Sequence, residues 1–218
     1  MDRAPAPAAL TVDTRWQQDG DGKHYATGRW RTRRARERDP RLVNRLLDTL
    51  GSQLPHRTVL DVPCGTGRLR PGLEARGFRW IGADISPSML GEAGGPLTRA
   101  SAAALPLADD AVDLAVCCRL IHHYEDAGPR TAVLAELARV ARRHVLVSYW
   151  DAASLTAWRR RTRGPLRRRK GKGLRHAVTC ETLEAELRAA GLTPLRRAFS
   201  MRWISAQAFV LAEVDRRP

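Results

Sequence analysis

The 218-residue sequence predicts an α/β fold: a doubly wound, mostly parallel sheet with helices on both faces. Short apolar runs alternate with amphipathic segments of about ten to fifteen residues, which is the pattern of βαβ units. One early run opens through a Gly-x-Gly turn into the segment that follows. The last two runs, residues 195–201 and 206–214, follow each other too closely for a helical crossover. We therefore expect them to form an antiparallel pair at one edge of the sheet.

The N-terminal part of the chain is expected to be a tail followed by the first helix. Residues 1–27 begin with an Ala/Pro-rich stretch and are expected to be a flexible tail. An arginine-dense stretch, residues 28–41, leads into apolar residues at helical spacing, and Gly51 is expected to end that helix. Residues 28–218 are expected to form one domain, since domains commonly have ~100–200 residues.

The remaining elements follow in alternation. At Ser86-Pro87 a capping hydroxyl precedes a proline at the favoured first position of a helix. Gly191 is expected to end the last helix. Strands are predicted at residues 58–62, 79–84, 111–118 and 144–150, and helices at residues 68–75, after residue 86, and at residues 128–142 and 180–190.

The chain is strongly basic, with 38 Lys+Arg against 23 Asp+Glu and a formal net charge of +15. Such a balance favours anionic partners: nucleic acid, a membrane surface, or phosphorylated or carboxylated small molecules. The alternative is that solvated arginines are spread over the whole surface.

Cysteine spacing and hydropathy restrict the class of protein further. The four cysteines form no C-x-x-C pair and have no histidine at ligand spacing, so no metal site is expected. Reduced thiols in a cytoplasmic protein are the simplest account. The N-terminus has no apolar signal region, and no stretch approaches the ~20 apolar residues of a transmembrane helix.

The first chemical motif is VLDVPCGTGRL, residues 59–69. A strand that opens through Gly65-Thr66-Gly67 into a helix exposes backbone N–H groups and lets a ligand approach closely. Such a turn can also be only a tight connection. A dinucleotide fingerprint would place a third glycine at position 70, where Arg70 stands, and this disfavours NAD.

The second motif is Asp84, at the end of the next predicted strand. A carboxylate offers two acceptor oxygens and can bind both hydroxyls of a ribose. Its alternative role is to cap the following helix. Together, the glycine loop and an acid one βα unit later favour a nucleoside ligand, bound at the carboxyl ends of the strands.

A third motif, LPLADDAVDL at residues 105–114, places a Leu-Pro pair before an acidic turn and an Asp-led strand. With these three motifs in this order, the chain resembles class I S-adenosylmethionine-dependent methyltransferases. More narrowly, it resembles the small-molecule branch that includes quinone-biosynthesis enzymes. The resemblance runs from about Leu42 to Val214, and it implies a Rossmann-like fold with S-adenosylmethionine as cofactor.

The resemblance also assigns cofactor-binding positions. It places Asp61, Gly65 and Gly67 at the methionine end of the cofactor and Asp84 on the ribose. Many relatives carry an aspartate at the adenine amino group where this chain has Ser101, which implies a weaker, neutral hydrogen bond. The remaining implied positions are Ile85 and Met89 beside the adenine, the backbone of Ala102 at its edge, and Cys118, which starts a segment lining the methyl-donor end.

Methyl transfer needs mainly in-line positioning, and a base only if the acceptor is a hydroxyl or an acidic carbon. His123, with His122 behind it, is the candidate base, because imidazole titrates near neutral pH. The alternative is a pair of packed or capping histidines. Tyr25 is a candidate to close over the cofactor.

A basic segment interrupts the later part of the chain. Residues 159–175 contain ten Lys+Arg, and no acid lies between Asp151 and Glu181, so removal of this segment would leave a formal charge of about +5. In the family that the chain resembles, substrate-binding insertions lie here, and we expect an insertion or lid at about residues 152–178. It would cover an anionic acceptor or contact an anionic membrane through Leu155 and Trp158. Two alternatives remain for this segment. One is an RNA-binding strip, which the lack of interleaved aromatic residues disfavours. The other is a solvated loop without a specific partner.

The function that the sequence favours is therefore O- or C-methylation of a small molecule, anionic or lipid-like. RNA methylation is the alternative enzyme activity. The chain lacks the Asn/Asp-Pro-Pro-aromatic tetrapeptide often used for it, and its only Pro-Cys, Pro63-Cys64, is in the cofactor loop. A non-catalytic S-adenosylmethionine-binding partner protein is the other alternative, favoured by Ser101. The sequence gives no indication of the oligomeric state.

Overall fold

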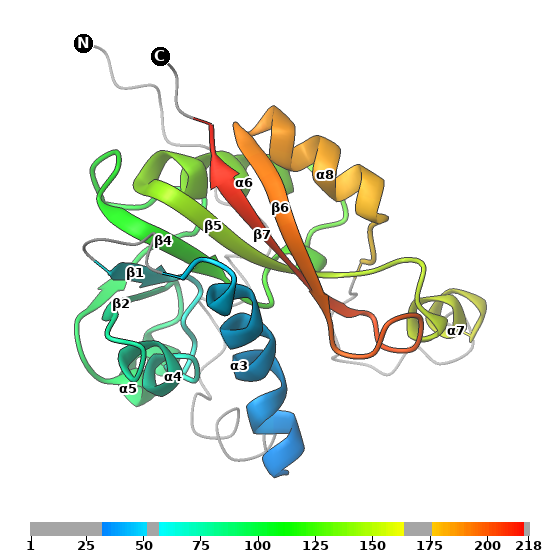
Figure 1. Ribbon diagram of the computed structural model, residues 1–218, viewed down its shortest axis with the longest axis horizontal. Helices are drawn as coiled ribbons and strands as arrows, with labels where there is room; N and C mark the ends of the chain where they lie inside the picture. Colours follow the sequence, from blue (N-terminus) through cyan, green and yellow to red (C-terminus); the bar gives the residue numbers. More distant parts are fainter. Residues whose placement is uncertain (1–31, 52–56, 164–175, 216–218) are drawn as a thin grey trace.

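The computed structural model describes residues 32–51, 57–163 and 176–215 (Figure 1). The predicted tail, Tyr25 and residues 164–175 of the basic segment lie outside the described residues.

A seven-stranded sheet forms the centre of the described chain, with the strand order β3-β2-β1-β4-β5-β7-β6. The first five strands pair in parallel, whereas β7 is antiparallel to both of its neighbours, β5 and β6. The predicted fold class is confirmed: the sheet is mostly parallel and ends in an antiparallel pair. The strands are β1 (Thr58–Asp61), β2 (Arg79–Asp84), β3 (Leu97–Arg99), β4 (Val112–Cys117), β5 (Ala141–Trp150), β6 (Leu192–Phe199) and β7 (Gln207–Val214).

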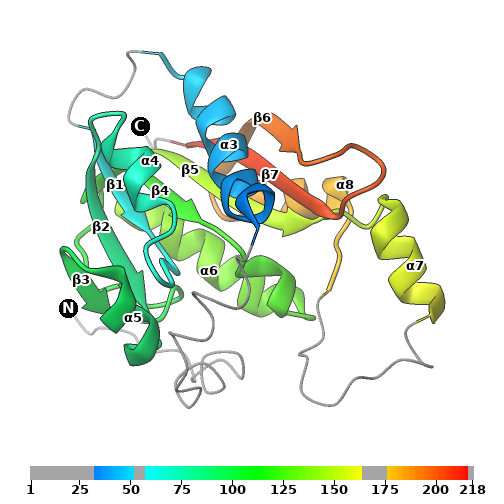
Figure 2. The ribbon, with the colours of Figure 1, turned by 90° about the horizontal axis from the view of Figure 1, so that it is seen from below.

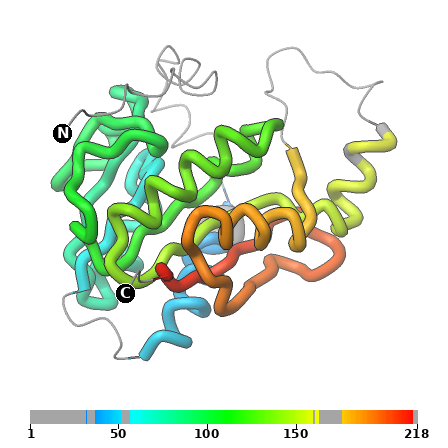
Figure 3. Tube along the Cα trace, turned by 90° about the horizontal axis from the view of Figure 1, so that it is seen from above, coloured from blue at the N-terminus to red at the C-terminus, as the bar shows by residue number. Residues whose placement is uncertain are grey.

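Helices cover both faces of this sheet. On one face, Leu137 of α6 (Ala127–Val140) and Leu183 of α8 (Cys180–Ala189) share a core cluster with Val145 of β5. Figure 3 shows these two helices side by side over the strands. On the other face, Leu46 and Leu73 pack with Phe209 of β7. The helices of that face are α3 (Arg33–Asp48), α4 (Arg70–Glu74) and α5 (Pro87–Ala93).

Two short elements lie beyond the carboxyl ends of the central strands. The 3-10 helix η1 (Ile121–His123) follows β4, and α7 (Leu155–Arg163) follows β5. Asp151 and Val178 form a parallel bridge. The two ends of the expected insertion therefore lie next to each other at this edge of the sheet. The basic segment therefore begins as a helix rather than as a loop.

Several predicted boundaries were wrong. Helix α6 ends at Val140, and β5 begins at Ala141 rather than at residue 144, because Arg142 belongs to the strand and donates to Asp113 Oδ1 at 2.9 Å. Strand β6 begins at Leu192, three residues earlier than expected, and residues 200–206 form the turn before β7. The predicted helix at residues 68–75 is only α4, and β3, of three residues, was not predicted.

Candidate cofactor and acceptor site

The predicted site residues gather where the strand order reverses. Strand β1 pairs with β2 on one side and with β4 on the other, so the chain returns to the middle of the sheet at this point. In open α/β sheets, ligands bind in the crevice outside the carboxyl ends of the strands at such a switch point. The glycine loop follows β1, Asp84 ends β2, and Cys118 follows β4, so the fold places all three at one edge.

The glycine loop has a backbone that requires its glycines. Gly65 and Gly67 have φ angles of +55° and +71°, in the left-handed region that other residues rarely adopt. A Cβ at Gly67 would lie 3.0 Å from the Ala93 carbonyl oxygen, whereas a Cβ at Gly65 would meet nothing within 4 Å. The loop is therefore packed on one side and open on the other, as a ligand cradle requires.

Asp84 joins this loop to the one after β2. Its Oδ2 accepts from the Gly65 N–H at 2.8 Å, and its Oδ1 accepts from the Ser86 N–H at 2.9 Å. The hydroxyl of Ser86 caps α5 by accepting from the Met89 N–H, so Ser86, not Asp84, is the N-cap of that helix. Asp84 is thus a buried carboxylate held in one orientation between the two loops.

Asp61 lies beneath the glycine loop and is 1% exposed. Its Oδ2 accepts from the indole N–H of Trp80 at 3.3 Å, while its Oδ1 has no hydrogen-bond partner among the described residues. Burial raises the pKa of Asp61 to about 7, against the opposing effects of Trp80 and Arg68. A buried carboxylate oxygen without a donor is costly, so this position is suited to a ligand that brings a cation.

Gly82 explains how Trp80 reaches Asp61. A Cβ at position 82 would lie 2.4 Å from the Trp80 ring and 2.8 Å from Leu97 Cδ2. Only glycine leaves room for the indole at this point in β2. The Arg70 guanidinium lies 5.2 Å from the centroid of the Trp80 ring.

The positions implied for the adenine follow β2 and β3. Met89 is buried and Ile85 is half-buried. The Ser101 hydroxyl accepts from the Ala103 N–H at 3.2 Å, and Ala102 is buried beside it. Ser101 is therefore part of a short turn, in which its hydroxyl oxygen already accepts one hydrogen bond.

The Leu-Pro element is held to α6 by two side chains. The Leu105 N–H donates to Glu136 Oε1 at 2.6 Å, and Arg139 donates to the carbonyl oxygens of Leu105 and Leu107. Burial acts to raise the pKa of Glu136, but hydrogen bonds from Arg139 and Leu105 hold it below its usual value. This anchoring fixes the segment that follows Ser101.

The two candidate histidines form η1, directly after β4. The His122 ring is 2% exposed and stacks on Trp150, with ring centroids 5.0 Å apart and planes 14° apart. The His123 ring lies 4.5 Å from that of His122 and is only half-buried. Arg130 of α6 donates to the Tyr124 and Glu125 carbonyls and so anchors the turn that follows.

A buried charge cluster beside Cys118 was not predicted. We call Asp39 and the three arginines around it, Arg38, Arg68 and Arg119, the Asp39 cluster. Asp39 Oδ2 accepts from Arg68 Nη2 at 2.7 Å and from Arg119 Nε at 2.6 Å, and Arg38 Nε lies 3.5 Å from Oδ1. Asp39 has no exposed surface. Burial opposes its ionisation, but Arg119 and Arg68 lower the pKa of Asp39 below its usual value.

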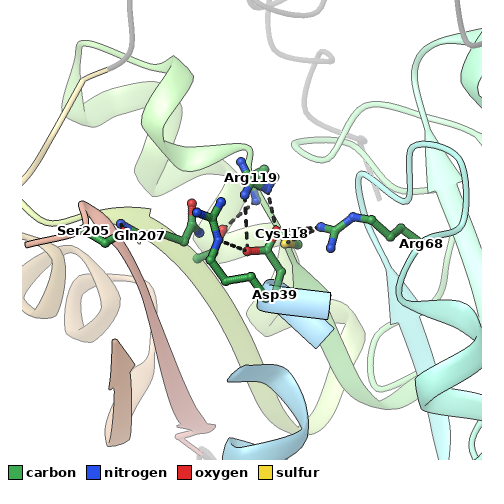
Figure 4. Close-up of polar contacts among 8 residues, drawn as sticks. Asp39, Arg68, Cys118, Arg119, Ser205 and Gln207 are labelled. Atoms are coloured by element: carbon green, nitrogen blue, oxygen red, sulfur yellow. Dashed lines mark hydrogen bonds and ion pairs between the residues drawn. The ribbon is translucent and has the colours of Figure 1, made fainter. Parts of the chain in front are cut away.

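The Asp39 cluster joins distant parts of the sequence at the site. Asp39 comes from α3, Arg68 directly follows the glycine loop, and Arg119 lies in the segment after β4 (Figure 4). Arg68 Nη2 also lies 3.9 Å from the sulfur of Cys118, and burial raises the pKa of that thiol to about 12. The Cys118 thiol is therefore a neutral wall of the site and not a nucleophile.

Gln207 approaches the same cluster from β7. Figure 4 shows its side chain extending toward Asp39 from the side opposite Arg68. Gln207 pairs in register with Trp150 and is 3% exposed, yet neither its amide oxygen nor its amide nitrogen has a hydrogen-bond partner among the described residues. A buried amide without partners is rare, which makes Gln207 a candidate ligand-binding residue.

Comparisons with known proteins show which proteins this chain is similar to. Residues 60–148 match the family model described as a methyltransferase domain. An uncharacterized methyltransferase of Mycobacterium ulcerans (strain Agy99) is 38% identical over 100 residues, which are 42% of this chain and 38% of that protein. The match thus spans less than half the length of that relative.

Solved structures extend the likeness over nearly the whole chain. Magnesium protoporphyrin IX methyltransferase (ChlM) from Synechocystis PCC 6803 with bound SAH has a TM-score of 0.71 at 17% identity, covering 94% of this chain and 98% of that chain. A methyltransferase of Thermotoga maritima, a possible histamine N-methyltransferase, has a TM-score of 0.62 at 19% identity, covering 88% and 92%.

Residues 60–148, which run from β1 into β5, are therefore similar to a methyltransferase domain. The described fold is similar to that of solved S-adenosylmethionine-dependent methyltransferases. The narrower resemblance to quinone-biosynthesis enzymes and the roles of the individual site residues stay predictions.

Proposed function

We propose that this chain transfers a methyl group from S-adenosylmethionine to a small-molecule acceptor, by O- or C-methylation. The observation that carries the proposal is Asp61, whose Oδ1 has no described partner beneath a glycine loop that is open on its outer side. The methionine end of the cofactor carries an ammonium group that would complete this carboxylate. The residues present therefore fit the cofactor.

Each predicted cofactor position has a role in this proposal. Asp61 binds the ammonium, and Gly65 and Gly67 let the backbone come close to the methionine end. Asp84 accepts from the ribose hydroxyls, in the orientation that the Gly65 and Ser86 amides give it. Ile85 and Met89 flank the adenine, Ser101 and the Ala102 backbone meet its edge, and Cys118 forms a neutral wall. When bound, the cofactor supplies an electrophilic methyl group on a sulfonium, a good leaving group.

His123 is the stronger candidate for the general base. Its ring is half-buried, so it can exchange a proton with an acceptor and with solvent. His122 is almost fully buried against Trp150 and is better placed to support the His123 ring. We assign the proton transfer to His123 and the positioning role to His122.

The Asp39 cluster supports an anionic acceptor. Three arginines and one aspartate leave a formal charge of +2, because Arg38, Arg68 and Arg119 carry three positive charges against one negative. Arginine guanidinium groups bind carboxylates well. The adjacent Gln207 amide offers one donor and one acceptor group to the same ligand. We propose that the acceptor places a carboxylate or a similar anionic group here.

The direct test uses a labelled methyl donor. The protein is incubated with methyl-labelled S-adenosylmethionine and cell extract, and the extract is then separated into small molecules, RNA and protein. We expect label in the small-molecule fraction with wild type and far less with His123→Ala. Label confined to RNA would overturn the proposal. Cofactor binding without any transfer would favour the non-catalytic partner protein.

RNA binding is tested separately by a salt titration. Association with RNA through phosphate contacts weakens steeply as salt rises. We expect methyl transfer to the small-molecule fraction to persist after ribonuclease treatment. A steeply salt-dependent RNA affinity together with ribonuclease-sensitive transfer would favour the RNA methyltransferase.

A further inference from the structure

Exposed apolar side chains gather at one end of the molecule. Six large hydrophobic residues are exposed in the described chain, and five of them lie on two segments, α7 and the turn between β6 and β7. They range from 37% to 60% exposed. We call these five residues the α7–turn surface: Leu155, Trp158, Met201, Trp203 and Ile204.

The two segments are fixed to one another by the backbone. The Leu155 N–H donates to the Trp203 carbonyl at 2.7 Å, and the Thr156 N–H donates to the Ile204 carbonyl at 3.1 Å. Within the turn, the N–H of Ile204 donates to the Met201 carbonyl at 3.1 Å. Figures 1 and 2 show α7 and the turn side by side at the end of the molecule away from β1 and β2. The apolar groups therefore form one preset surface.

Arginines border this surface, and acids are absent from its segments. Arg159 and Arg161 are exposed on α7, and the Arg202 guanidinium lies 4.9 Å from the centroid of the Trp203 ring. Residues 152–163 and 200–212 contain no Asp or Glu. Tryptophans with neighbouring arginines suit the boundary between lipid headgroups and acyl chains, where the indole is amphipathic and the cations meet anionic headgroups.

We propose that the α7–turn surface docks on an anionic phospholipid bilayer. Charge disfavours a second copy of this chain as the partner. A symmetric contact would pair this surface with itself and bring two sets of arginines together, with no acid on either segment to compensate them. No described helix is long and apolar enough to cross a membrane, so the contact proposed is peripheral. It uses residues of the β6–β7 turn as well as the two α7 residues that the sequence indicated.

The docked surface adjoins the acceptor side of the site. The turn leads directly through Ser205 and Ala206 into Gln207, and the Asp151 N–H, one residue after Trp150, donates to the Ala206 carbonyl at 2.7 Å. A lipid-like acceptor would therefore reach the site from the membrane. This last consequence, unlike the docking itself, rests on the proposed methyltransferase function.

Vesicle co-sedimentation of the full chain tests the docking without any activity readout. Wild type is mixed with vesicles of phosphatidylcholine alone, or of phosphatidylcholine with added phosphatidylglycerol. We expect binding only to the anionic vesicles. Replacing Trp158 and Trp203 together by Ser should weaken it about a hundredfold, because two aromatic side chains lose their apolar contact. Replacing Arg159 and Arg202 by Gln should weaken it about thirtyfold, from the loss of two basic residues at the headgroups.

Two matched variants control for general effects. Leu195→Ser removes the exposed apolar residue outside the α7–turn surface, and Arg79→Gln removes an exposed arginine on β2. Both should bind as wild type does, and thermal melting checks that every variant folds. The proposal is overturned if wild type does not bind anionic vesicles or if the tryptophan variant binds them equally well. It is also overturned if wild type is a dimer that the tryptophan variant converts to a monomer.

Discussion

Asp61 gives the sharpest test of the cofactor site, because its protonation should control cofactor affinity. Its buried carboxyl has a pKa of about 7, raised by burial and, to a lesser degree, by Asp84. An ammonium group beside it requires the ionised form. We therefore expect S-adenosylhomocysteine, which keeps the ammonium group, to bind more tightly as the pH rises through 7.

The size of the effect follows from the populations. With a pKa of about 7, roughly one tenth of Asp61 is ionised at about pH 6 and roughly nine tenths at about pH 8. The apparent affinity scales with the ionised fraction of Asp61, so it should rise about tenfold over this range. Asp61→Asn keeps the shape but cannot ionise, so this variant should bind weakly and lose most of the rise.

The raised pKa of Asp61 has the opposite effect on the stability of the ligand-free protein, which should fall as the pH rises. The folded-state pKa of Asp61 lies above its ordinary value of 3.8, so the folded protein binds more protons between about pH 4 and 7. Stability falls as the pH rises through this window, by about 4 kcal/mol for a shift of this size. Without ligand, Asp61→Asn should therefore be more stable than wild type at about pH 8, with the advantage shrinking toward pH 4.

Isothermal titration calorimetry and urea unfolding measure the two effects. Other groups titrate in the same range, so the quantity of interest is the difference between wild type and Asp61→Asn. An equal pH dependence of S-adenosylhomocysteine affinity in both proteins would refute the role of Asp61. A variant less stable than wild type at every pH would show that the carboxylate is satisfied within the protein.

Three further changes probe other parts of the account. His123→Ala should lower kcat about 10²–10⁴-fold in steady-state assays without changing S-adenosylhomocysteine affinity, and a loss of affinity instead would make His123 a binding residue. Asp39→Ala should lower the free energy of unfolding in urea by about 3–5 kcal/mol, because it leaves three arginines without their buried partner. The control Asp48→Ala, at an exposed ion pair with Arg76, should lower it by under about 1 kcal/mol. Equal losses would contradict the importance of the Asp39 cluster. Gly82→Ala should lower the melting temperature and displace Trp80, and unchanged melting would contradict the packing described for it.

The sequence was sufficient for the parts of the site that depend on local chain order. The glycine loop, Asp84 and the segment after β4 each follow a buried apolar run, and parallel strands bring such segments to one edge. The antiparallel finish was also predictable, because residues between β6 and β7 are too few for a crossover. These features depend on spacing alone.

The Asp39 cluster and Gln207 could not be predicted, because they depend on tertiary packing. Asp39 lies in an arginine-dense helix and looked like one charge among many, yet it is the fully buried partner of arginines 29 and 80 residues away. Gln207 is an ordinary strand residue until its pairing with Trp150 places it at the site. For Asp39, the local signal was its position as an acid within a strongly basic stretch.

The missed boundaries have a similar cause. No glycine or proline separates α6 from β5, so the change of period at Ala141 has no turn signal. Arg142 looked helical because charged residues usually mark exposed helix ends, whereas it pairs with Asp113 at the start of β4. Long-range pairing, not propensity, sets that boundary.

The central claim is that the loop after β1 and Asp84 hold S-adenosylmethionine. Its most direct test is calorimetric titration of S-adenosylhomocysteine into wild type, Asp84→Ala and, as a matched control, the exposed Asp126→Ala. We predict binding by wild type and the control, and a loss of about a hundredfold in Asp84→Ala, since two charge-assisted hydrogen bonds to the ribose disappear. No binding by wild type, or equal affinity in Asp84→Ala, would contradict the assignment.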